Sequence, residues 1–336
     1  MTPPLQHRLV RDMVRIRGVE ETLADLYRDE QEMRTPVHFS IGQEATSVGV
    51  CAAAHRTDVV YAGHRSHAPY LAKGGDLDAM VAELYGKRTG CAAGRGGSVH
   101  LVDTAAGFGG SAAILGEMIP VAVGAAWAFA MERSPRVALT FFGDGASEEG
   151  TFHEALNFAQ LHRLPVVFVC ENNGYSIASP LAARQPAGHA IRERARGYGM
   201  PARLVDGNDV LAVHRAAEEA LAHCRSGHGP YFLELVTYRW REHVGPGWDH
   251  DEAGGYRPRA EVDSWIGRCP IRGAADALRE SDPAIDDRID RWTAEFRTET
   301  RQAVDRARAA AFPDVADLLD GAYEPRPTAA HSGRNQ

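Results

Sequence analysis

The sequence has few of the features that would place a protein outside the cell, in a membrane or on nucleic acid. Its five cysteines show no Cys-x-x-Cys spacing, so neither a disulfide framework nor a zinc site is indicated. The N-terminal stretch after Pro3 and Pro4 lacks the apolar run of an export signal or a membrane span. A net charge of −8 with scattered basic residues disfavours anionic partners. We therefore expect a soluble, cytoplasmic protein that binds neither nucleic acid nor membrane.

Apolar segments that are typical of buried strands alternate with segments of helical periodicity. The predicted strands are 137–142, 166–170 and 231–238, and the predicted helices are 5–27, 120–131, 151–162 and 209–224, the last capped by Asn208. This alternation predicts an α/β fold, a doubly wound and mostly parallel sheet with helices on both faces. The Ala/Gly-rich helix 120–131 is expected to be buried on all sides and to lie at a subunit interface.

Two long segments are expected to contain little regular structure, and the end of the chain is expected to form an extension. Residues 37–73 are rich in histidine and small residues, and 90–116 contain eight glycines. We predict a binding domain at 1–265, a helical extension at 266–324 and a disordered tail at 325–336. An amphipathic helix at 285–307 is expected within the extension, as a subunit-facing element without chemistry.

Two polar motifs follow neighbouring predicted strands. Gly143-Asp144-Gly145 follows the first, and Asn173, 29 residues after Asp144, follows the second. Ligands bind at the carboxyl ends of strands in an open parallel sheet, where helix N-termini favour phosphate. Asp144 and the side-chain oxygen of Asn173 are the oxygen ligands that Mg2+ prefers. The spacing of Gly143, Gly145 and Gly150 differs from the dinucleotide fingerprint Gly-x-Gly-x-x-Gly. A diphosphate held through Mg2+ is therefore predicted.

These motifs and their flanks, 142–150, 152–157 and 164–175, resemble alpha subunits of the pyruvate, branched-chain and acetoin dehydrogenase complexes. The resemblance covers roughly residues 5–265 and includes the thiamine-diphosphate signature. It implies the transketolase-like fold, thiamine diphosphate and Mg2+ as cofactors, and a small 2-oxo acid or acetoin as substrate. By the same resemblance, Asp144, Asn173 and the Tyr175 carbonyl are the protein ligands of Mg2+, and Gly143, Gly145 and Ala146 hold the diphosphate.

Further matched segments place other residues at the cofactor. The resemblance assigns His38, His64 and His67 to the cofactor channel, and His243 to a position near the reacting carbon, where an imidazole can move protons. Arg65 and Arg239 would contact the diphosphate. His100 ends a matched glycine-rich segment. Leu115, in the matched segment that also holds Ala113, would prop the cofactor in its bent form.

The same resemblance implies partners. Alpha subunits of this family lack the Glu that activates the aminopyrimidine, and a beta subunit supplies it. We therefore expect a heterotetramer of two alpha and two beta chains, with a lipoyl acyltransferase as acceptor of the acyl unit.

Three residues depart from the family pattern and keep other functions open. Arg241 replaces a histidine, Val244 stands where mitochondrial relatives carry a phosphorylated serine, and Glu148 adds negative charge beside the diphosphate turn. These changes leave the cofactor in place but affect the acceptor. The alternative is a carboligase or transketolase-like enzyme that transfers a two-carbon unit to a sugar or another carbonyl. A non-enzymatic subunit that only supports its beta partner is a third possibility.

Overall fold

The computed structural model describes residues 4–188 and 190–319, and their centre is a parallel sheet of six strands. The strands lie in the order β2-β1-β3-β4-β8-β7, and every neighbouring pair is parallel. Their bounds are β1 (Val59–Ala62), β2 (Phe108–Ser111), β3 (Ala138–Gly143), β4 (Val166–Asn172), β7 (Ala202–Asp206) and β8 (Tyr231–Val236). The predicted α/β fold is confirmed.

The central strands are apolar along their whole length because helices cover both faces of the sheet. Successive side chains of β3 point to opposite faces. Leu139 and Phe141 join one core, and Ala138 and Phe142 join the other. Thus the predicted strands at 137–142, 166–170 and 231–238 correspond to β3, β4 and β8, with ends shifted by up to two residues.

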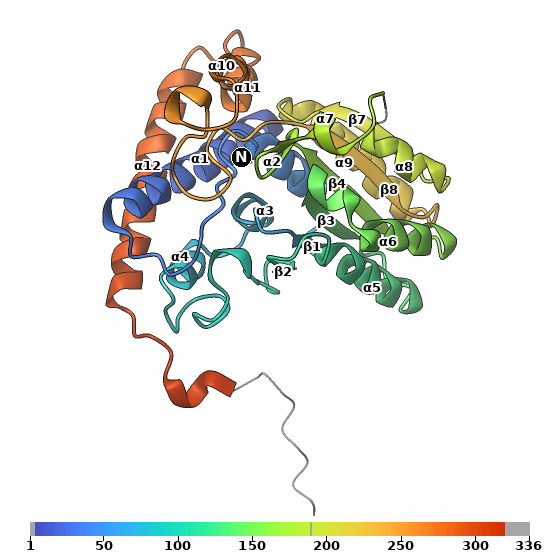
Figure 1. Ribbon diagram of the computed structural model, residues 1–336, viewed down its shortest axis with the longest axis horizontal. Helices are drawn as coiled ribbons and strands as arrows, with labels where there is room; N and C mark the ends of the chain where they lie inside the picture. The colour runs from blue at the N-terminus through green and yellow to red at the C-terminus, as the bar shows by residue number, and fades with distance from the viewer. Residues whose placement is uncertain (1–3, 189, 320–336) are drawn as a thin grey trace, which may run out of the picture.

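Helices pack on both faces of the sheet (Figure 1). One face carries α5 (Met118–Met131), α6 (Gly150–Leu161) and α8 (Ile191–Gly197). The other carries α2 (Glu44–Ala53), α3 (His67–Lys73) and α9 (Val210–Arg225). In the described part of the chain, no helix has the length and hydropathy needed to cross a bilayer.

Two long helices, α1 (Leu5–Glu30) and α12 (Ile285–Ala309), run side by side at the edge of the molecule (Figure 1). Gly18 of α1 permits their close approach, because a Cβ there would lie 3.3 Å from the Cβ of Phe296. Three further helices complete this region: α4 (Leu77–Leu84), α10 (Arg259–Gly267) and α11 (Pro270–Asp276). The division into domains at residue 265 stays a prediction, and the predicted tail at 325–336 lies outside the described residues.

Short elements connect the larger ones and surround the site. They are β5 (Tyr175–Ser176), β6 (Ser179–Pro180), α7 (Leu181–Arg184) and the 3-10 helices η1 (Gly97–Val99), η2 (Asp144–Glu148), η3 (Asp251–Ala253) and η4 (Val315–Leu319).

Three sequence-based expectations about local structure were wrong. The segment 37–73 is not poor in regular structure, because it forms α2, β1 and α3. Helix α9 is capped by Asp209 instead of Asn208, since the Asp209 side chain accepts hydrogen bonds from the backbone N–H groups of its first turn. Helix α5 is not buried on all sides, because Val121, Trp127 and Met131 are exposed on its outer face.

Candidate active site

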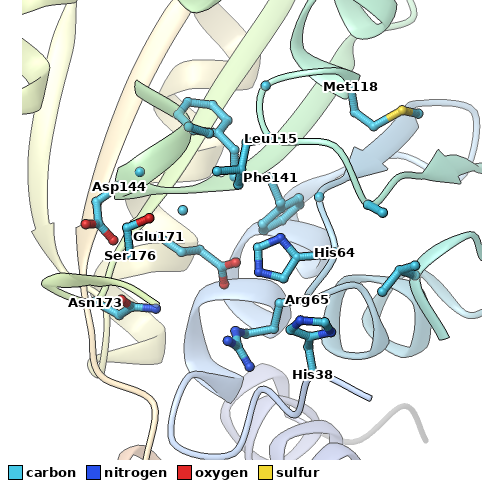
Figure 2. Close-up of a pocket in the computed structure, with 18 of the residues that line it drawn as sticks. His38, His64, Arg65, Leu115, Met118, Phe141, Asp144, Glu171, Asn173 and Ser176 are labelled. Carbon is cyan, nitrogen blue, oxygen red and sulfur yellow. The ribbon is translucent and has the colours of Figure 1, made fainter. Parts of the chain in front are cut away.

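A cavity of about 460 Å³ opens at the carboxyl edge of the sheet. Strands β1, β3 and β4 end there, so the segments that follow them form much of its wall (Figure 2). Twelve of the residues predicted to act at the cofactor line the cavity: His38, His64, Arg65, Ala113, Leu115, Gly143, Asp144, Gly145, Ala146, Asn173, Tyr175 and His243. The parallel topology brings together residues more than 200 positions apart in the chain, as with His38 and His243.

Asp144 begins η2 directly after β3, and only 1% of its surface is exposed. Its Oδ1 is buried and has no hydrogen-bond partner among the described residues. Its Oδ2 forms an ion pair with Arg184. Burial raises the pKa of Asp144, although Arg184 acts to lower it. A buried carboxylate oxygen without a donor is costly, and a bound cation would satisfy it.

Asn173 lies beside Asp144, on the turn that follows β4. The two strands are in register at their ends, where Gly143 pairs with Glu171. The Asn173 side chain donates to Gln43 Oε1 over 3.2 Å and accepts from the Tyr175 backbone N–H over 3.1 Å. These bonds fix the amide so that its oxygen faces the turn, near the cavity wall that Asp144 also lines.

Gly145 keeps the turn after Asp144 open to close approach. A Cβ at this position would lie 2.5 Å from Ser176 Oγ, a distance that real Cβ atoms do not adopt. No heavy atom lies within 4 Å of a Cβ built on Gly143. Gly145 is therefore needed for packing against Ser176. Gly143 leaves bare backbone on the cavity wall, as a diphosphate-binding turn requires.

The contacts of Glu148 account for the charge that it adds near this turn. Its Oε1 accepts hydrogen bonds from Arg184 Nη1 and, over 2.8 Å, from Gln185 Nε2. Arg184 thus bridges Glu148 and Asp144. The two carboxylates and the guanidinium form a charge cluster in which Glu148 is paired.

His38, His64 and His243 face one another across the cavity and come from three separate segments. The ring centroids are 4.7 Å apart for His38 and His64, 5.0 Å for His38 and His243, and 5.4 Å for His64 and His243. Burial, and then the nearby Arg65 charge, lower the pKa of His38 to about 2, of His64 to about 3 and of His243 to about 4. All three imidazoles are therefore neutral at pH 7.

These low values predict a loss of stability in mild acid. The folded-state pKa values of His38 and His64 lie below the ordinary value of 6.5, so unfolding takes up protons below that pH. Above pH 6.5 these two histidines do not reduce the free energy of unfolding. As the pH falls from 6.5 toward the folded-state pKa values, the free energy of unfolding decreases. The free energy of unfolding should decrease by up to about 1.4 kcal/mol per pH unit for each histidine.

Urea unfolding at a series of pH values from about 7.5 to about 5 measures this dependence. His64→Gln should flatten it, because this variant removes one of the lowered pKa values. Equal slopes for His64→Gln and the wild type would contradict the assignment.

Three of the predicted site residues do not line the cavity. His67 is fully buried, with Nε2 2.8 Å from Ser98 Oγ and Nδ1 3.4 Å from Glu20 Oε1. Arg239 is buried and donates to Asp249 Oδ2 over 2.8 Å. His100 is exposed after η1. Their assignment to the cofactor stays a prediction.

Sequence reasoning missed two charged residues at the site. Glu171 lines the cavity and accepts a hydrogen bond from Thr46, and burial raises its pKa to about 7. Its position directly before Asn172 and Asn173 was the available signal. Arg184 had no such signal, because its contact with Asp144 joins positions 40 residues apart through β5, β6 and α7.

Comparisons of the sequence with known proteins show which family the chain resembles. The family model described as "Dehydrogenase E1 component" matches residues 11–316. The alpha subunit of acetoin:2,6-dichlorophenolindophenol oxidoreductase from Bacillus subtilis is 45% identical over 227 residues, 68% of each chain. The pyruvate dehydrogenase E1 component subunit alpha from Porphyra purpurea is 36% identical over 317 residues, 92% of this chain and 90% of that protein. The acetoin oxidoreductase alpha subunit from Cupriavidus necator is 38% identical over 297 residues, 85% of each chain.

Proposed function

Because this chain belongs to the dehydrogenase E1 component family, we propose that it is the alpha subunit of a thiamine-diphosphate-dependent enzyme. Its reaction is the decarboxylation of a small 2-oxo acid, or the cleavage of acetoin, with transfer of the acyl unit to a lipoyl group. The observation that carries this proposal is the buried, unpartnered Oδ1 of Asp144 beside Asn173 at the carboxyl edge of the sheet. A cytosolic location is part of the proposal.

The residues present fit a Mg2+ ion with a diphosphate. Asp144, the Asn173 side-chain oxygen and the Tyr175 carbonyl are hard oxygen donors, which Mg2+ prefers in an octahedral shell. Arg184 supplies a positive charge beside Asp144. Mg2+ would take over this charge compensation, and the released guanidinium would then be free to pair with phosphate.

Thiamine diphosphate, when bound, supplies the electron sink for decarboxylation. The chain binds and orients it. Leu115, which is 39% exposed on the cavity wall, would give the bound cofactor apolar support. Arg65 holds its guanidinium at the same wall by donating to the Phe39 carbonyl, and is placed to attract an anionic group.

The neutral histidines can exchange protons with the substrate. A neutral imidazole accepts a proton at one nitrogen while it donates a hydrogen bond from the other. His243 lies on the loop after β8, close to His38 and His64. We assign to His243 the proton transfer at the substrate oxygen and to His38 and His64 the hydrogen bonds that orient the substrate.

The relatives are named as alpha subunits, which implies a beta subunit as the partner. We propose that the beta chain supplies the activating Glu and that two alpha and two beta chains assemble as a heterotetramer. A lipoyl acyltransferase is the proposed acceptor. The apolar outer face of α5, with Val121, Trp127 and Met131 exposed, is the surface that we assign to assembly.

Trp127→Glu should therefore weaken assembly. The Trp127 side chain is 45% exposed and packs on the rings of Phe158 and His162. A glutamate there would be exposed in the single chain, which should still fold. In the proposed interface, however, its charge would be buried. Light scattering after size exclusion should show separate alpha and beta chains for this variant. Leu204→Glu is the matched control, because Leu204 is 46% exposed on the edge strand β7. If both variants assembled like the wild type, α5 would not be part of the interface.

The reaction is tested with the purified alpha–beta complex. Pyruvate, other small 2-oxo acids and acetoin are supplied with thiamine diphosphate, Mg2+ and 2,6-dichlorophenolindophenol. We expect cofactor-dependent reduction of the dye with at least one of these substrates. A new ketol product without dye reduction would contradict it and would establish carboligation instead. Comparison of the substrates identifies the 2-oxo acid.

A further inference from the structure

Three imidazoles converge in the cavity wall, and we call His38, His64 and His243 the histidine triad. One ring nitrogen from each lies within 4.8 Å of the other two. The rings meet edge to face, with interplanar angles of 65°, 81° and 62°. They come from the segment before α2, the turn after β1 and the loop after β8, so the fold itself brings them together.

The triad is free of the bonds that usually fix structural histidines. His38 Nδ1 is buried without a hydrogen-bond partner in the described ranges. The neighbouring His67 is held at one ring nitrogen, because its Nε2 lies 2.8 Å from Ser98 Oγ, whereas its Nδ1 lies 3.4 Å from Glu20 Oε1 without a hydrogen bond. Neutral imidazole is the form that binds a metal.

We propose that the histidine triad binds a divalent transition metal ion of the Zn2+ class when the cofactor is absent, and that this ion closes the cavity to the cofactor. Three imidazoles with an open fourth position are a known type of zinc coordination. The metal binding is independent of the proposed function. The competition between this metal ion and thiamine diphosphate rests on the proposed function.

Ligand chemistry separates this site from the Mg2+ site in the same cavity. Imidazole nitrogen suits Zn2+, Co2+, Ni2+ and Cu2+, whereas Asp144 and Asn173 offer the oxygens that suit Mg2+. Tetrahedral ligands about 2.0–2.1 Å from zinc lie about 3.4 Å apart, so the ring nitrogens must approach by up to about 1.4 Å. Rotation of side chains on three loops can supply this movement.

The charge of Arg65 opposes the cation. Its guanidinium lies close enough to lower the pKa of all three histidines. Glu171 and Glu20 lie close enough to act on Arg65 in turn. We therefore expect moderate affinity, with reversible occupation. A site of this kind would couple the amount of cofactor-competent enzyme to the level of free transition metal.

The test uses Co2+ and Zn2+ on the cofactor-free alpha–beta complex. Bound Co2+ with nitrogen ligands in tetrahedral geometry gives intense visible absorption, and Zn2+ should displace it. We expect one Co2+ per alpha chain in the wild type. His38→Ala and His64→Ala should each weaken binding at least about tenfold, a loss of about 1.4 kcal/mol.

Two control variants make the test specific. His228→Ala changes the other close histidine pair, in which the His223 and His228 rings are 5.3 Å apart, and should leave Co2+ binding unchanged. Asp144→Ala removes the proposed Mg2+ ligand and should also leave it unchanged. Wild-type Co2+ affinity in both His38→Ala and His64→Ala, or no Co2+ binding by the folded wild-type complex, would overturn the proposal.

Competition distinguishes this proposal from the proposed function. Saturation with thiamine diphosphate and Mg2+ should abolish the Co2+ absorption, and Zn2+ should raise the apparent dissociation constant of the cofactor. Simultaneous binding of both would overturn the closure of the cavity. If Co2+ binds to the triad and the cofactor never binds, the metal site stands and the proposed function fails.

Discussion

Asp144→Ala is expected to abolish Mg2+-dependent binding of thiamine diphosphate. Asp144 is the only charged residue among the three proposed metal ligands, and its unpartnered Oδ1 is buried at the cavity wall. Loss of one partner from a buried charged pair costs about 3–5 kcal/mol, so the cofactor should bind about 10² to 10⁴-fold more weakly. Calorimetric titration of the alpha–beta complex with the cofactor, at saturating Mg2+, measures the change.

Two further variants separate loss of the ligand from loss of the fold. Asp144→Asn preserves the shape of the side chain and removes its charge, so it should also lose most of the affinity. Asp206→Asn removes an exposed carboxylate that pairs with Arg268 over 2.9 Å, and should bind the cofactor like the wild type. Thermal unfolding checks that each variant is folded. Affinity near the wild-type value in folded Asp144→Ala would refute the assignment of the metal site.

His243→Ala is expected to lower turnover with little change in cofactor affinity. The imidazole lines the cavity and is neutral at pH 7, so it can act as a proton acceptor or donor toward the substrate. Loss of a general acid or base lowers kcat by about 10² to 10⁴-fold. The dye-reduction assay gives kcat, and calorimetry gives the dissociation constant of the cofactor.

Separate values of kcat and of the cofactor dissociation constant distinguish proton transfer by His243 from cofactor binding. His243→Gln preserves hydrogen bonding without proton transfer, so it should also be slow. His228→Ala, in the exposed segment between α9 and β8, should retain wild-type kcat. If His243→Ala lost cofactor affinity and kept its kcat with saturating cofactor, the residue would hold the cofactor instead of moving a proton.

Much of the fold was predictable because the apolar pattern of the strands is strong. The β3 and β4 segments are buried along nearly their entire length, and such runs indicate strands covered on both faces. Parallel strands end at the same edge, so the motif at Asp144 and the motif at Asn173 were expected to meet, and both line the cavity. Periodicity and topology together therefore located the site.

Other features depend on contacts that local sequence does not encode. Strand β7 (Ala202–Asp206) has exposed Arg203 and Leu204 at the edge of the sheet, so it lacks the apolar pattern of the central strands. Helix α5 reads as apolar on every side, yet one of its faces is exposed in this chain. A sequence shows the composition of that face but not whether the same chain or another covers it.

The charge cluster at Arg184 is the clearest example of this limit. In the sequence alone, Glu148 adds a negative charge beside the diphosphate turn, and no neighbouring residue balances this charge. Its partner lies 36 positions later in the chain and reaches it only because β5, β6 and α7 fold back over η2. Asp144 and Glu148 together hold Arg184, and neither residue alone indicates this arrangement.

The proposed diphosphate site can be tested by calorimetric titration of thiamine diphosphate into the wild-type alpha–beta complex, with and without Mg2+. We expect one cofactor to bind per alpha chain, and we expect this binding to require Mg2+ and to disappear when a chelator removes the metal. If an intact, folded complex failed to bind the cofactor, or bound it equally well without Mg2+, the diphosphate would not be held through a metal ion at Asp144 and Asn173.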